Sequence, residues 1–144
     1  MCIRDSIKYL VHLLGDMHCP THVYYYPDNM TLGKFPIKLH GVETNYHKIW
    51  DGQLLDSRHK FWGFQDYRHA LDNYTDEEIA RMTEGTPVEW FEESARRCRE
   101  IYDWVQPGDE LGQEFYNAHA PFAEYQLVLS GYRLAKVLNA LFDR

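Results

Sequence analysis

Helix signals recur along the whole chain and constrain its fold more than any other feature. From Ile7 to Cys19 the apolar residues return with a period near 3.6, which is typical of a helix with one buried face. Thr75 and Thr86 each stand three residues before a glutamate, the spacing of a capping box at a helix start. Pro87 follows Thr86, and proline is favoured at the first helical position. The sequence therefore predicts an almost all-helical domain.

The remaining segments add a small β element to this mostly α fold. Residues 23–44 contain scattered prolines and glycines and are expected to be irregular, apart from a short strand at 35–39. The helix expected at 45–56 is weakened at Gly52, since glycine is a poor helix former. Further helices are expected at 65–73, 75–85, 86–105 and 121–142. A chain of 144 residues is of the size of one domain.

Charge and hydropathy limit the classes of partner. The net charge of −7 argues against a protein that holds nucleic acid through a basic face. It does not exclude a nucleic-acid enzyme, because bound divalent cations can reverse the field at a site. The apolar runs are too short to cross a bilayer, so we expect no stable membrane association. Nothing in the sequence points to a protein partner.

Cysteine usage gives little support for a thiolate metal site. The three cysteines form no C-x-x-C pair, which is the spacing typical of zinc sites built from thiolates. An odd number allows at most one internal disulfide, and a bond between Cys19 and Cys98 is left open.

Two His-x-x-x-Asp pairs are the pattern that carries chemistry. His12 and Asp16 are four residues apart, as are His47 and Asp51. At ~100° per residue the two members of each pair lie within about 40° of each other on one helix face. Two such pairs on neighbouring helices could supply nitrogen and oxygen ligands to zinc. Each could equally be an ordinary solvated helix pair, and the spacing alone gives the two interpretations about equal weight.

Two further histidines flank the first pair. His18 sits about 200° around the helix from Asp16, so it is expected to pack or to support the site rather than to bind metal. His22 lies beyond Pro20, where the helix geometry cannot be extended, and it could turn back toward the metal.

Three segments resemble the zinc-dependent S1/P1 family of single-strand-specific nucleases. HLLGDMHCPTH at 12–22 resembles the family motif H-F-x-G-D-x-H-Q-P-x-H, and NYHKIWD at 45–51 resembles N-L-H-x-x-W-D. GYRLAKVLN at 131–139 resembles the closing helix, G-x-R-L-A-x-x-L-N. The order is the same in the family, and zinc-dependent phospholipases C share the ligand spacing. The resemblance implies a multi-helix phospholipase C/nuclease-type fold.

The resemblance also implies a set of ligands for a cluster of three zinc ions. His12 would bind the first zinc, and Asp16 would bridge the first and third and thereby take part in catalysis. His22, His47 and Asp51 would hold the second. The family's other ligands lie before the first motif, so we expect one complete zinc site here and half a site at His12 and Asp16.

The chain departs from the family pattern at several points. Cys19 stands where the family has Gln, and a Gly-Gly-Asn loop between the motifs is absent. Residues 1–6 read as a translated sequencing adapter, so we expect 7–144 to be the C-terminal part of a single nuclease domain.

The function implied is zinc-dependent hydrolysis of phosphodiester bonds in single-stranded DNA or RNA. It would leave 5′-phosphates, with 3′-nucleotidase activity as well. Tyr24 and Tyr25 are candidates for base stacking, or they belong to an ordinary surface or core aromatic cluster, which is the more common case. The family is exported, so a periplasmic or secreted parent is expected. Two alternatives stay open: a phospholipase C-like phosphodiesterase, and a helical fragment that binds at most one zinc and catalyses nothing.

Overall fold

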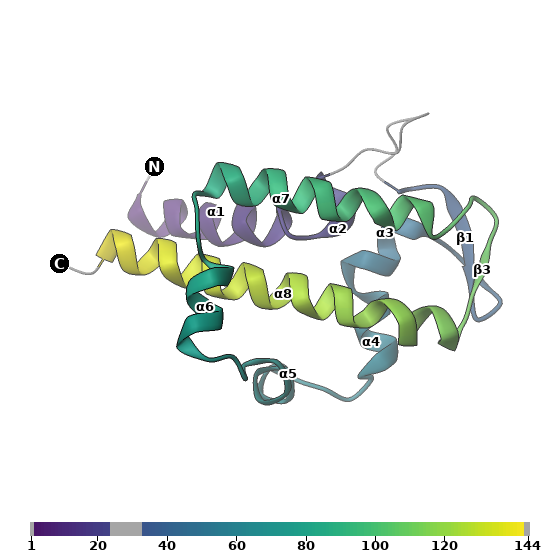
Figure 1. Cartoon of the computed structure of the whole chain (residues 1–144). Helices are drawn as coiled ribbons and strands as arrows, with labels where there is room; N and C mark the ends of the chain where they lie inside the picture. The colour runs from purple at the N-terminus through teal and green to yellow at the C-terminus, as the bar shows by residue number, and fades with distance from the viewer. Residues whose placement is uncertain (1, 24–32, 143–144) are drawn as a thin grey trace.

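The computed structural model describes residues 2–23 and 33–142 and shows a mostly helical chain with a small sheet at one end (Figure 1). The fold class predicted from the sequence is confirmed. Within the described residues no helix is both long and apolar enough to cross a membrane. The helices are α1 (Ile3–Asp16), α2 (Pro20–Val23), α3 (Tyr46–Lys48), α4 (Leu54–Arg58), α5 (Phe64–Leu71), α6 (Asp76–Met82), α7 (Pro87–Arg99) and α8 (Gln113–Phe142), with a π-helical segment at Ile49–Gln53 and a 3-10 turn at Glu100–Asp103.

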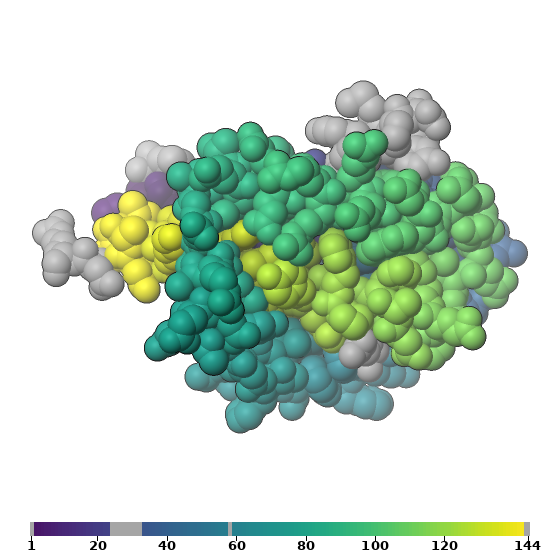
Figure 2. Space-filling view, in the orientation of Figure 1, coloured from purple at the N-terminus to yellow at the C-terminus, as the bar shows by residue number. Residues whose placement is uncertain are grey.

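Helix α8 is the element on which the others assemble. Its 30 residues would extend about 45 Å, since an α-helix rises 1.5 Å per residue. It contacts α1, α4 and α6, while α7 packs on α2. The start of α1 and the end of α8 lie at the same end of the molecule (Figure 1). On the face seen in Figure 2, the side chains of α6, α7 and α8 cover most of α1.

Helix starts follow the capping signals of the sequence. Thr75 and Thr86 cap α6 and α7, and each receives the reciprocal hydrogen bond from the glutamate three residues later. The Asn45 side chain accepts a hydrogen bond of 3.0 Å from the backbone N–H of Lys48 and so caps α3. These bonds satisfy backbone donors that have no partner within the helix.

The sheet is larger than the sequence indicated. Strand β1 (Pro36–Leu39) pairs with β2 (Val42–Asn45) antiparallel and with β3 (Glu110–Leu111) parallel. Strand β2 was expected to be irregular, and that expectation is wrong. His40 and Gly41 have φ of 49° and 78°, so they form a two-residue turn whose twist matches that of paired strands.

Two helix boundaries also differ from expectation. Helix α1 ends at Asp16 rather than Cys19, because the chain turns before Pro20 starts α2. Helix α8 begins at Gln113 rather than 121 and continues through Pro121. Tyr116 and Ala120 are fully buried in this first part of α8, so packing outweighs the hydrogen bond that proline cannot make.

The main core fixes the segment that carries the second His-x-x-x-Asp pair. Tyr46 is fully buried, and its hydroxyl donates a 2.7 Å hydrogen bond to the carbonyl of Ile101. Trp50 is 7% exposed and lies edge-on to Tyr46. The helical path from 46 to 58 is interrupted at Gly52, as expected. Burial of Tyr46 and Trp50 leaves His47 and Asp51 on the outer side of this segment.

Candidate metal centre

The first His-x-x-x-Asp pair lies at the C-terminal end of α1. The Nε2 atom of His12 is 3.4 Å from an Asp16 carboxylate oxygen. The other Asp16 oxygen is 3.2 Å from Nδ1 of His22, so α2 does turn His22 back toward Asp16. This nitrogen is buried and makes no hydrogen bond to any described residue. The Nδ1 atom of His22 therefore lies close to an Asp16 oxygen, but the geometry of this contact is not that of a hydrogen bond.

The second pair meets the same histidine from the other side. The Nε2 atom of His22 is 3.0 Å from Oδ1 of Asp51, and Nε2 of His47 is 3.4 Å from Oδ2 of Asp51. The rings of His22 and His47 stack with centroids 5.0 Å apart. The fold thus links all five predicted ligand residues through a series of pairwise contacts, from α1, α2, α3 and the π-helical segment.

His18 anchors the turn between Asp16 and His22. It is 2% exposed, its Nδ1–H donates a 2.7 Å hydrogen bond to the carbonyl of Leu14, and its Nε2 accepts from Arg133 at 3.0 Å. Burial is the main cause that lowers the pKa of His18, so the ring is neutral. Gln126 donates a 3.1 Å hydrogen bond to the His18 carbonyl. His18 packs rather than joining the cluster, as its position on the helix predicted.

Arg133 is part of the same anchor. It is 3% exposed, pairs with the carboxylate of Glu93 and donates a 2.9 Å hydrogen bond to the carbonyl of Met82. This arginine therefore forms a buried structural ion pair. Glu93 has a lowered pKa: burial acts to raise it, but the hydrogen bond and charge of Arg133, with Arg97, outweigh burial.

A pocket of about 280 Å³ opens beside the cluster. Asp16, His22 and Asp51 line one side of it. Leu55, Ala123 and Leu127 supply apolar surface. A ligand here would meet charged groups and apolar surface together.

The ion pairs of the cluster contribute little to stability. The side chains of Asp16 and Asp51 are 42% and 43% exposed, and ion pairs at such sites contribute at most about 1 kcal/mol. The atoms that face each other are 3.0 to 3.4 Å apart. In a tetrahedral zinc site with bonds of 2.0–2.1 Å, neighbouring ligand atoms are ~3.3 Å apart. The donor types suit zinc, and within the described residues the ligand atoms of Cys19, His22 and Asp51 are the ones that all lie within 4.8 Å of one another.

Cys19 is a member of the cluster that the sequence reasoning left out. Its Sγ is 4.0 Å from Oδ1 of Asp51, and Cys19, His22 and Asp51 each offer a ligand atom within 4.8 Å of the others. Burial is the main cause that raises the pKa of this thiol. The signal was its place within the first motif, where it was noted only as a departure. Cys2, Cys19 and Cys98 are all free thiols, so the structure contains no Cys19–Cys98 bond.

Two further histidines have structural partners. His59 pairs with Glu124 at 2.7 Å, and His119 stacks on Trp104. Tyr24 and Tyr25 fall outside the described residues.

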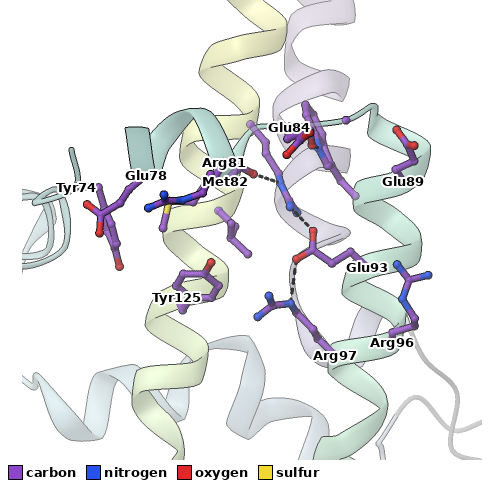
Figure 3. A pocket seen from close by; sticks show the side chains of 14 residues that line it. Tyr74, Glu78, Arg81, Met82, Glu84, Glu89, Glu93, Arg96, Arg97 and Tyr125 are labelled. Carbon is purple, nitrogen blue, oxygen red and sulfur yellow. Dashed lines mark hydrogen bonds and ion pairs between the residues drawn. The ribbon is translucent and has the colours of Figure 1, made fainter. Parts of the chain in front are cut away.

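A larger pocket of about 830 Å³ lies between α6, α7 and α8 and contains none of the predicted ligands (Figure 3). Both signs of charge line it, and Glu93 pairs with Arg133 and with Arg97, the second of which is labelled beside it in Figure 3. These two arginines hold the Glu93 carboxylate in structural ion pairs. The smaller pocket beside the histidines and carboxylates is the candidate site.

Comparison with known proteins decides the family. The S1/P1 Nuclease family profile matches residues 3–143. The chain belongs to the S1/P1 nuclease family. It is similar to three proteins of Arabidopsis thaliana. Endonuclease 2 is 26% identical over 163 residues, which cover 97% of this chain and 52% of the relative. Endonuclease 4 is 25% identical over 159 residues, which cover 98% of this chain and 52% of the relative. Endonuclease 1 is 24% identical over 159 residues, which cover 98% of this chain and 50% of the relative.

The chain spans about half the length of these curated relatives. Family membership agrees with the phospholipase C/nuclease-type fold expected from the motifs, and the mostly helical structure is consistent with it.

Proposed function

We propose that the protein of which this chain is part hydrolyses phosphodiester bonds in single-stranded DNA or RNA with zinc, leaves 5′-phosphates, and also acts as a 3′-nucleotidase. The observation that carries the proposal is the series of contacts that joins His12, Asp16, His22, Asp51 and His47, in a chain that belongs to a nuclease family.

In this proposal His22, His47 and Asp51 hold one zinc ion as a complete set. Asp16 faces both His12 and His22, and these contacts support a carboxylate that two metal ions would share. His12 and Asp16 form half of a second site, whose other ligands would come from further residues of the whole protein. When bound, zinc lowers the pKa of a coordinated water to about 7 and polarises the phosphoryl oxygen.

The surroundings of the cluster support a nucleotide substrate. The apolar side chains of Leu55, Ala123 and Leu127 lie beside the carboxylates, where a base or sugar could pack while its phosphate meets the metals. A splayed single strand can enter such a recess more easily than a duplex. We assign Tyr24 and Tyr25 to base stacking as part of the same proposal. We also propose that the whole protein acts outside the cytoplasm, in the periplasm or after secretion.

Metal analysis of the chain tests the ligand set. We expect close to one zinc per chain after purification, and loss of that zinc in His47→Ala. His69→Ala is the matched control, because His69 is an exposed histidine whose hydrogen bond is to a carbonyl of its own helix. Zinc retained by His47→Ala, or absent from the unaltered chain, would contradict the assignment.

Substrate assays with the full-length protein test the activity. Cleavage of single-stranded DNA ahead of duplex DNA, with 5′-phosphate ends, is expected. Turnover of phosphatidylcholine with no cleavage of nucleic acid would replace the proposal by a phospholipase C-like function. Zinc bound with neither activity would leave a non-catalytic zinc-binding domain.

A further inference from the structure

We propose that Cys19 binds a metal ion together with His22 and Asp51, which makes this a mixed imidazole, carboxylate and thiolate site. The inference rests on the metal centre in the proposed function and adds a ligand to it. A site built only from thiolates is excluded by the absence of a C-x-x-C pair, but a single thiolate among other donors is not.

The positions of the three donor atoms allow a common ion. The ligand atoms of Cys19, His22 and Asp51 all lie within 4.8 Å of one another. Three such atoms can share a point at most about 2.8 Å from each, which is 4.8 divided by √3, compared with zinc bonds of 2.0–2.3 Å. Side-chain shifts of about half an ångström would complete the bonds.

The sulfur is held toward the cluster without a strong competing bond. It lies 3.7 Å from Oγ1 of Thr21, 3.9 Å from the Trp50 carbonyl and 4.0 Å from Oδ1 of Asp51. These contacts are weak, because a thiol is a poor hydrogen-bond donor and acceptor. Cys19 itself packs against the main core, and the adjoining Pro20 and Thr21 are buried. The backbone therefore fixes the sulfur beside the Asp51 carboxylate, and little is lost when a metal replaces its contacts.

Charge balance favours this ligand set. Coordination breaks the S–H bond of Cys19 and releases one proton to solvent, since a coordinating thiol is deprotonated by the metal. One thiolate and one carboxylate then neutralise a divalent cation, whereas His22, His47 and Asp51 alone leave a net charge of +1. A thiolate also favours zinc over magnesium or manganese.

The consequence is an ion that would join α2 to the segment that carries Asp51. With three protein ligands, such a tetrahedral site would keep one position open.

Cobalt substitution tests the sulfur directly. We expect the chain loaded with Co²⁺ to show a near-ultraviolet thiolate-to-cobalt charge-transfer band as well as visible d–d bands. Cys19→Ser and Cys19→Gln should lose the charge-transfer band but retain the visible bands through the remaining ligands. Cys2→Ser is the matched control, because Cys2 is an exposed thiol at the far end of α1, and it should keep the band.

A second measurement needs no variant. X-ray absorption of the zinc-loaded chain should show one sulfur at about 2.3 Å with nitrogen and oxygen neighbours at about 2.0 Å. Metal bound without sulfur, or a charge-transfer band that persists in Cys19→Ser, would overturn the role of Cys19 and leave the His22, His47 and Asp51 site intact. Failure of the chain to bind either metal would instead overturn both this inference and the proposed function.

Discussion

At the scale of single residues, buried polar side chains set the geometry of the ligand segment. His18 is neutral with its proton on Nδ1, because the Leu14 carbonyl can only accept, and its other nitrogen accepts from Arg133. Arg133 in turn neutralises Glu93. The turn that orients Asp16 and His22 is therefore attached to α7 and α8 through groups whose hydrogen bonds leave little freedom.

Replacement of Arg133 by Met should destabilise the chain by about 3 kcal/mol, because loss of one partner leaves buried polar groups unsatisfied. The free energy of unfolding from urea titration measures the effect. Arg96→Met is the control, since Arg96 pairs with Glu92 at 3.9 Å with its side chain 71% exposed, and it should change stability by less than about 1 kcal/mol. Equal losses of stability in the two variants would show that the buried ion pair contributes no more to the free energy of unfolding than the exposed one.

At the scale of elements, the sequence predicted the start of a helix correctly where a capping residue marks it. Thr75 and Thr86 start α6 and α7 as expected. The start of α8 was misplaced, because Pro121 reads locally as a helix start but lies within the helix. Strand β2 was missed because its turn uses His40 with a positive φ, which is uncommon for a residue other than glycine.

Replacement of Pro121 by Ala should raise stability by about 1 to 3 kcal/mol. Pro121 is exposed, so alanine opens no cavity, and it restores a backbone donor inside α8. Thermal and urea unfolding measure the gain. A loss of stability would mean that the geometry imposed by the proline is needed to seat Tyr116 and Ala120 in the core.

At the scale of the whole molecule, the candidate site joins parts of the chain that are distant in sequence. Asp16 ends α1, His22 lies on α2, and Asp51 lies on the π-helical segment. A metal ion bound among them would hold the folded state together, because the unfolded chain offers no such arrangement.

Zinc should therefore stabilise the chain, and a chelator should remove that gain. At a free zinc concentration of 100 times the dissociation constant, the free energy of unfolding should rise by about 2.7 kcal/mol. Calorimetry with buffered zinc and with chelator measures it, with magnesium as the control ion. The dependence should disappear in Asp51→Asn, and a zinc effect that survives this change would place the ion elsewhere.

The sequence alone determined the helical class, the capped helix starts and the pairing of each histidine with the aspartate four residues on. These depend on local geometry, since helix periodicity places residues i and i+4 on one face. Only the tertiary structure decided that His22 returns between Asp16 and Asp51, that Arg133 is buried against Glu93, and that Cys19 stands beside the cluster. Those outcomes depend on how α1, α2, α7 and α8 pack, and contacts between residues far apart in sequence leave no local pattern to read.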